Sequence, residues 1–321
     1  MRAVVLTARF LFSANYLKVC YNKPYKTKTE DIMDYSQILS QQFNIKEEYA
    51  KNIITLLDDG NTIPFIARYR KEMHGSMDDQ LIREFAEKLE YLRGLDKRRD
   101  EIRSLIDAQE KLTDEINLAL DKAATLSELE DIYRPYRPKR KTRASIAKEK
   151  GLEPLANDIL KQEKGFDPSK SAVDYIDEEK GVTSVEDAIQ GAMDIIAELV
   201  SDNAEIRKRI RNLTNANGVL VSVATDEEKD SVYKNYYDYK EPVKKIAGHR
   251  VLAVNRGEKE GFLKVSVETD SEKPLNSIFR AMITDKNQLC SDIIREACTD
   301  AYQRLIYPSI EREVRNDLTD T

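Results

Sequence analysis

The sequence predicts a mainly α-helical, elongated protein with little β-structure. Charged residues make up 34% of the 321 residues and hydrophobic residues 40%, and there are only 11 glycines and 9 prolines. This balance suits charged helices better than a compact sheet protein. Apolar residues also recur at steps of three and four over long stretches, which is typical of amphipathic helices. The length alone predicts about two domains.

The first 32 residues do not continue this pattern. They begin with a basic residue and an apolar stretch, as a signal peptide does, but Arg9 interrupts the apolar run. We therefore expect residues 1–32 to be a disordered extension, with the first helix opening near Met33. No other stretch approaches the roughly 20 apolar residues that cross a bilayer, so no membrane association is expected.

Helices are predicted from residue 35 to residue 59 and again over residues 64–72. In the second segment, PFIARYRKE, we expect a surface helix with Ile66 and Tyr69 facing the core. Its three basic residues would then stay in water.

A long central helix is predicted to begin near Ser76, which has capping-box spacing to Asp79. Its apolar stripe continues for roughly 30 residues at helical spacing. A further helix is expected over residues 114–123. The next one begins near Ser127, in a second capping box, and ends almost at once at Pro135.

Two short helices, residues 145–150 and 152–161, are expected on either side of Gly151. Their spacing resembles a helix-turn-helix, although Asn157 stands where that motif expects an apolar residue, and a plain helical hairpin is the alternative. The polar connection that follows, residues 164–182, is the candidate domain boundary. It divides an N-terminal helical domain, residues 33–165, from a central helical region, residues 184–321.

In the second region, residues 184–213 predict one strong helix. Residues 218–223 are compatible with either a strand or a helix, and the alternation over residues 262–269 predicts a short strand. The tyrosines of residues 236–239 could stack on bases or form a packed aromatic seam. Residues 285–307 predict another helix, which Pro308 would break before a last helix begins.

The most informative feature is a cluster of positive charge. The chain has a net charge of −6, but between Arg134 and Lys150 eight basic residues face one acid, Glu149. Lysine and arginine neutralise phosphates, and Pro135 and Pro138 would keep the segment extended. The candidate nucleic-acid-binding residues are therefore Arg134, Arg137, Lys139, Arg140, Lys141 and Arg143. In the alternative interpretation these side chains pair with acids of neighbouring helices and serve the fold.

Catalytic and metal motifs are not recognisable in the sequence. The two histidines, His74 and His249, have no Cys or acidic neighbour at metal-ligand spacing. The three cysteines, Cys20, Cys290 and Cys298, fit neither a disulfide framework nor a metal site, which favours the reducing cytoplasm. We expect no enzymatic activity and no cofactor. A two-metal nuclease built from distant carboxylates is the exception that spacing leaves open.

Three segments together resemble the Tex family of bacterial transcription accessory proteins. They are TIPFIARYRKEMHGSMDD (62–79), LEDIYRPYRPKRKTRASIAKEKGLEPLA (129–156) and EPVKKIAGHRVLAVNRGEKEGFLKV (241–265). The resemblance runs from about Met33 to the end and implies a helical region with a long central helix and helix-turn-helix-like elements. In the family, an RNase H-like domain, helix-hairpin-helix units and an OB-fold RNA-binding domain follow. We expect this chain to stop before them, and the family motifs name no catalytic residue here.

These observations predict part of a transcription accessory factor that contacts the backbone of RNA or DNA weakly. RNA polymerase or other transcription machinery is a further expected partner. The alternative is a helical scaffold that binds protein partners of that machinery and makes no direct nucleic-acid contact.

Overall fold

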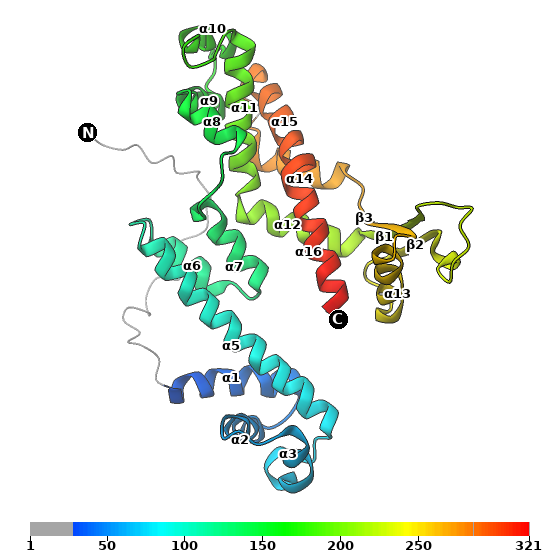
Figure 1. Ribbon diagram of the computed structural model, residues 1–321. Helices are drawn as coiled ribbons and strands as arrows, with labels where there is room; N and C mark the ends of the chain where they lie inside the picture. Colours follow the sequence, from blue (N-terminus) through cyan, green and yellow to red (C-terminus); the bar gives the residue numbers. More distant parts are fainter. Residues whose placement is uncertain (1–27, 285, 321) are drawn as a thin grey trace. The chain divides into compact units, whose positions relative to one another are not determined.

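The computed structural model describes residues 28–284 and 286–320, and helices dominate it, as the sequence predicts (Figure 1). Contacts group these residues into two units, one ending at Lys97 and the other beginning at Arg98. The boundary falls inside the 29-residue helix α5, Asp79–Asp107, which confirms the predicted long helix. Of the extension predicted over residues 1–32, residues 1–27 lie outside the described residues, and the first helix begins at Lys28 rather than near Met33. The domain limits proposed from the sequence stay a prediction.

The first unit is a small helical bundle. Its core is formed by fully buried side chains that include Leu39, Ile53, Ile66 and Phe85. His74 is also buried, with its Nε2 3.1 Å from the carbonyl oxygen of Ile66, so it belongs to this core. Besides the first part of α5, the helices are α1 (Lys28–Phe43), α2 (Glu47–Asp58), α3 (Ile63–Tyr69) and α4 (Lys71–His74).

Two helices begin near the predicted caps but not at them. Ser76 lies in the left-handed region with φ of 65°, and the carboxylate of Asp78 accepts the N–H of Leu81 at 2.8 Å instead. Similarly, Thr125 rather than Ser127 caps the next predicted helix, since its hydroxyl accepts the N–H of Glu128 at 3.3 Å. In both cases a second capping residue stands within two positions of the predicted one, and the sequence pattern did not distinguish them.

The second unit contains most of the helices and one extended core. Within it, α11 packs against α8, α9 and α15 (Figure 1). The helices after α5 are α6 (Asp114–Lys122), α7 (Leu126–Tyr133), α8 (Arg143–Glu149), α9 (Glu153–Lys161), α10 (Pro168–Ala172), α11 (Val185–Ser201), α12 (Ala204–Asn217), α13 (Gly248–Lys259), α14 (Glu272–Met282), α15 (Gln288–Asp300) and α16 (Tyr307–Asp320). Short 3₁₀ turns cover Arg134–Tyr136, Val173–Tyr175 and Lys234–Tyr236.

The turn between α8 and α9 is the one predicted at Gly151. This glycine adopts φ of +85°, a conformation that costs other residues free energy. The next residue, Leu152, is buried and packs directly over Gly191 of α11, where an added Cβ would lie 2.3 Å from the leucine Cδ1. The helix pair is therefore fixed against α11 by a close approach. Whether it acts as a helix-turn-helix stays a prediction.

The prediction of a single helix over residues 184–213 is wrong, because the helix is interrupted in the middle of this range. The structure has α11 and α12 there, separated at Asp202 and Asn203. Asn203 leaves the helical conformation, with ψ of 111°, and its side chain accepts the N–H of Ile206 at 3.0 Å. The apolar period continues across the break, so the spacing alone could not reveal this new helix start.

Pro308 does not break the last helical stretch as predicted. A π-helical turn, Ala301–Ile306, joins α15 to α16 without a gap, and Pro308 lies in the first turn of α16. A widened turn relieves the clash between a proline ring and the preceding carbonyl groups. The predicted start of this stretch at Asp285 lies outside the described residues.

A three-stranded antiparallel sheet completes the second unit, with strand order β2-β1-β3. The strand predicted over residues 262–269 is confirmed as β3 (Leu263–Glu268), and the ambiguous segment 218–223 forms β1 (Val219–Ala224). The tyrosines of residues 236–239 lie in and before β2 (Asp238–Pro242) and pack around a small core with α13. They form the packed seam that was one of the two interpretations.

Candidate nucleic-acid interface

The basic strip, Arg134 to Arg143, connects α7 to α8. Its first three residues continue α7 as a 3₁₀ turn, and the extended conformation predicted for the whole segment begins only at Arg137. At the other end Thr142 caps α8: its hydroxyl accepts the Ser145 N–H at 3.0 Å, and its own N–H donates to the Ser145 hydroxyl at 2.8 Å. The strip is thus anchored by a helix at each end.

Arg134 turns away from solvent. Its side chain is partly buried, and Nη2 donates to the hydroxyl of Ser309 on α16 at 3.4 Å. Burial and the neighbouring positive charge of Arg207 both lower the pKa of this guanidinium. Of the predicted site residues, Arg134 is therefore the one most involved in packing.

Two further strip residues are paired with carboxylates. Arg137 donates to Glu130 at 2.9 Å and lies over the ring of Tyr133, with 5.8 Å from the guanidinium carbon to the ring centroid. Lys139 forms ion pairs with Asp202 and, at 3.4 Å, with Glu198. The charges of both residues are largely offset by acids of α7 and of the α11 end.

The remaining three strip residues are exposed and have little or no pairing with acids among the described residues. Lys141 has only a loose ion pair with Glu149, at 3.6 Å, and 69% of its side chain is accessible. Among the residues that the structure describes, Arg140 and Arg143 form no ion pair. The charge of Arg143 does act at longer range: burial raises the pKa of Asp194, and Arg143 opposes that rise. These three cations form the outer face of the strip.

A groove of about 470 Å³ lies under the strip. Four strip cations line it, but five carboxylates line it as well, so it offers no excess of positive charge to a phosphate. Contact with a nucleic-acid backbone would therefore use the outer face. The lining cations are Arg134, Arg137, Lys139 and Arg140, and the lining acids are Glu130, Asp131, Glu198, Asp202 and Glu313.

A buried network of charges lies behind this groove. Asp131 of α7 accepts from Arg207 and, at 2.6 Å, from Arg211, while Glu313 of α16 accepts from both arginines at 2.8 Å. The Arg207 side chain is fully buried. Burial disfavours the charge of Arg211, but the two carboxylates outweigh it and raise the pKa of that guanidinium. The network joins α7, α12 and α16.

Sequence reasoning missed this network altogether. A usable signal was present, because Arg207 and Arg211 stand one helical turn apart, next to the buried Ile206 and Ile210. Arginines that follow an apolar stripe in this way are buried only when acids from other helices meet them. The partner acid, Asp131, is 76 residues away from Arg207.

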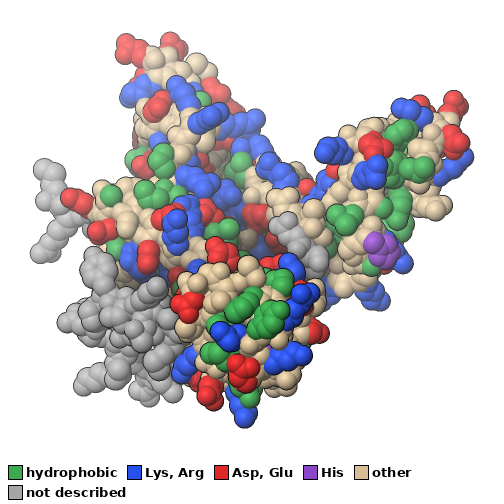
Figure 2. Space-filling view, turned by 60° about the horizontal axis from the view of Figure 1, so that its bottom comes forward, with side chains coloured by type: hydrophobic (Ala, Val, Ile, Leu, Met, Phe, Trp, Pro, Cys, Tyr) green, Lys and Arg blue, Asp and Glu red, His purple; other side chains and the backbone are tan. Residues whose placement is uncertain are grey.

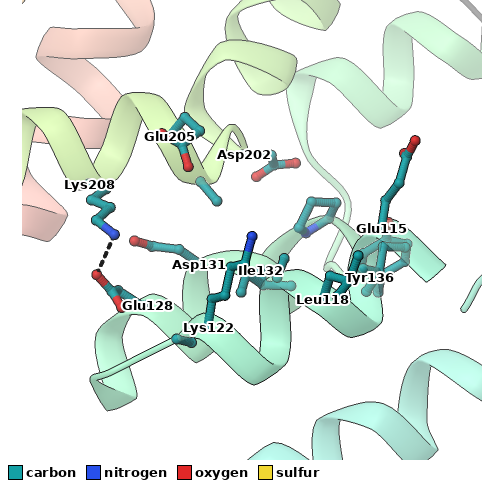
Figure 3. A pocket seen from close by; sticks show the side chains of 15 residues that line it. Glu115, Leu118, Lys122, Glu128, Asp131, Ile132, Tyr136, Asp202, Glu205 and Lys208 are labelled. Atoms are coloured by element: carbon teal, nitrogen blue, oxygen red, sulfur yellow. Dashed lines mark ion pairs between the residues drawn. The ribbon is translucent and has the colours of Figure 1, made fainter. Parts of the chain in front are cut away.

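A second cavity, of about 640 Å³, opens among α6, α7 and the start of α12 (Figure 3). Leu118, Ile132 and Tyr136 form an apolar side, and Lys208 is held by Glu128 at 2.9 Å. The acidic side chains outnumber the two lysines, so the cavity does not suit a phosphate. The acids are Glu115, Glu128, Asp131, Asp202 and Glu205.

The segment 64–72 differs from its prediction in one side chain. Ile66 is buried as expected, but the expectation that Tyr69 faces the core is wrong, since 65% of Tyr69 is exposed. Tyr69 is the last residue of α3, and the backbone leaves the helical conformation at Arg70 before α4 begins. The core that covers Ile66 therefore does not extend over the tyrosine ring.

The described residues show neither a cluster of metal ligands nor a membrane-spanning helix. No three His, Cys, Asp or Glu side chains lie together there as metal ligands would. No helix in residues 28–284 or 286–320 is long and apolar enough to cross a membrane.

Comparison with known proteins identifies the family. A model described as "Tex-like protein N-terminal domain" matches residues 33–107, and one described as "Tex central region-like" matches residues 163–321. An uncharacterised protein, YdcI of Bacillus subtilis, is 43% identical over 295 residues, which cover 90% of this chain and 41% of that protein.

Named relatives give the same result. The transcriptional accessory protein Tex of Neisseria gonorrhoeae is 35% identical over 299 residues, which cover 90% of this chain and 39% of the relative. S1 RNA-binding domain-containing protein 1 of Homo sapiens is 30% identical over 312 residues, covering 92% of this chain and 31% of that protein. The chain thus spans less than half the length of these relatives. On the two family models and these relatives together, the chain belongs to the Tex family.

Proposed function

We propose that this chain supports transcription by contacting the phosphate backbone of nucleic acid weakly, through the outer face of the basic strip. The observation that carries the proposal is the exposure of Arg140, Lys141 and Arg143, three neighbouring cations with little or no carboxylate pairing in residues 28–284 and 286–320. Arg137 would contribute from the edge, since its side chain is 59% exposed despite its pair with Glu130. Arg134 and Lys139 would hold the strip in place.

The names of the relatives support the same proposal. One is a transcriptional accessory protein, and another is named for an S1 RNA-binding domain. For this chain we expect the same setting, which is transcription in the cytoplasm, with RNA or DNA as the ligand. The proposed role is non-enzymatic, and the nuclease alternative would be rejected if RNA and DNA stay intact with magnesium or manganese.

The test is a salt titration of binding to labelled single-stranded RNA and duplex DNA. Each lost phosphate contact lowers the slope of log K against log salt by about 0.9 on duplex DNA and about 0.7 on single strands. The double variant Arg140→Ala/Lys141→Ala should therefore lose roughly 1.4 to 1.8 of that slope. Its matched control, Lys170→Ala/Lys180→Ala, removes the same charge from other exposed sites of the same unit and should keep the slope.

The competing function is a scaffold that binds only protein components of the transcription machinery. The pairing of Arg137 and Lys139 with acids favours it, as does Leu118, which is 57% exposed on the apolar side of the second cavity. No binding to either nucleic acid at low salt, or an unchanged slope in the double variant, would reject the backbone proposal in favour of this one.

A further inference from the structure

The first unit carries a surface group of aromatic and basic side chains in and after α3, of which Phe65 and Arg70 are half-buried and the others exposed. We call it the α3 patch, and it consists of Phe65, Arg68, Tyr69, Arg70 and Lys71. Hydrophobic side chains lie exposed next to lysines and arginines, with acidic ones nearby, on the face of the molecule that Figure 2 brings forward. The patch is separate from the basic strip, and it does not depend on the function proposed for that strip.

Tyr69 is the central residue of the patch. The residue is 65% exposed, although it stands only three residues from the buried Ile66. The ring is nevertheless not isolated, because its centroid lies 5.4 Å from that of Phe65, with the two planes inclined by 42°. One ring thus supports the other at the surface.

Positive charge surrounds this ring pair. The guanidinium carbon of Arg70 lies 5.3 Å from the centroid of Phe65, which fixes a cation beside the aromatic group. Arg68 and Lys71 are exposed on either side. Within the part of the chain that the structure describes, none of the three forms an ion pair, so all three charges remain available.

We propose that the α3 patch binds single-stranded nucleic acid, with one base stacked on Tyr69 and the adjoining phosphates against Arg68, Arg70 and Lys71. Aromatic rings flanked by cations bind single strands in this way without reading sequence. In a duplex the faces of the bases are covered by their neighbours, so only an unpaired base can reach the ring. The three cations of the patch would suit a phosphate backbone as well as an acidic protein surface. The exposed aromatic ring favours nucleic acid, because a base can stack on it.

The chain offers a clean reporter, because it contains no tryptophan. Tyr69→Trp would place a single indole at the patch, and a base stacked on it should quench its fluorescence. We expect saturable quenching by an oligouridylate or oligothymidylate of about fifteen nucleotides, and little by a duplex of the same length. Tyr91→Trp is the matched control: Tyr91 is 42% exposed with Lys88 over its ring, but α5 also carries Glu87 and Glu90 within one turn of it.

Binding measurements on the full chain complete the test. Base–aromatic stacking predicts that Tyr69→Ala weakens single-strand binding by roughly 5-fold to 100-fold. Tyr69→Phe keeps the ring and should bind like the wild type, and Tyr91→Ala should do so as well. Since Tyr69 is largely exposed, circular dichroism should show the same helix content in all four proteins.

Three results would overturn the proposal. They are no quenching of Tyr69→Trp at saturating oligonucleotide, equal quenching by single strand and duplex, or undiminished binding by Tyr69→Ala. Failure here is distinguishable from failure of the strip. If Arg140→Ala/Lys141→Ala alone loses affinity, the strip is the site and the patch is not, whereas loss in Tyr69→Ala alone gives the opposite result.

Discussion

Two arginines of α12 and the outer cations of the basic strip lie in the same unit but in opposite environments. Arg207 and Arg211 are buried, and two carboxylates from other helices hold them. Arg140 and Arg143 are exposed and form no ion pair among the described residues. The residue type is the same in both places, so the difference comes from the acids that the fold brings to each.

This difference shows what a count of charges along a sequence can and cannot indicate. The window around the strip stands out because eight basic residues follow one another closely, yet Lys139 is paired by acids about 60 residues away, at Glu198 and Asp202. The less conspicuous α3 patch has three cations that form no ion pair with any residue that the structure describes. Whether a basic side chain can bind a ligand therefore depends on whether the fold places an acid beside it, and not on the local density of positive charge in the sequence.

The largest expected effect tests the buried side of the comparison. Asp131→Asn keeps the size of the side chain but removes one of the two negative charges that hold Arg207 and Arg211. Breaking a buried pair in this way costs about 3–5 kcal/mol, and we expect the lower end because Glu313 remains. The free energy of unfolding, from urea denaturation followed by circular dichroism, measures the loss.

A more exposed pair of the same kind provides its control. Glu128 is 18% exposed but binds Lys208, whose side chain is 49% exposed, so Glu128→Gln should cost about 1 kcal/mol and clearly less than Asp131→Asn. If Asp131→Asn costs no more than Glu128→Gln, the buried network does not hold the three helices together and the comparison fails.

The next effect concerns how firmly the strip is held. Thr142→Ala removes the N-cap of α8 and the hydrogen bond from the threonine hydroxyl to Glu198, 3.0 Å long. Loss of such a cap costs about 1 kcal/mol. Thr142→Ser retains the hydroxyl and should restore most of the stability, measured by the same denaturation. Equal stability of the alanine and serine variants would mean that the strip needs no anchor at this end.

Much of the fold follows from apolar spacing, and the failures have a common cause. The stripe of α5 and the alternation of β3 depend only on neighbours in sequence, and both are predicted correctly. Asn203 is different: α11 ends just before it and it caps α12, while the apolar period runs on. Periodicity records which face is buried but not where the backbone turns.

The candidate site shows the same limit more strongly. The strip residues are recognisable from their composition, but their pairing is not, because Glu130, Glu198 and Asp202 come from other helices. Tyr69 was expected in the core on spacing alone, and the end of α3 leaves it in water. In each case the presence or absence of a tertiary contact decides the role of the side chain.

The smallest expected effect separates two neighbours within the strip. Lys139 is paired with two acids, so Lys139→Ala should cost a few tenths of a kcal/mol to about 1 kcal/mol and leave the salt dependence of RNA binding unchanged. Arg140 shares no such pair, so Arg140→Ala should leave the free energy of unfolding unchanged and lower the salt slope by about 0.7 on single-stranded RNA. Both variants remove one positive charge from adjacent positions, so a general change in net charge would affect both equally. Identical salt slopes for the two variants would therefore show that pairing with acidic side chains does not decide which strip cations contact phosphate.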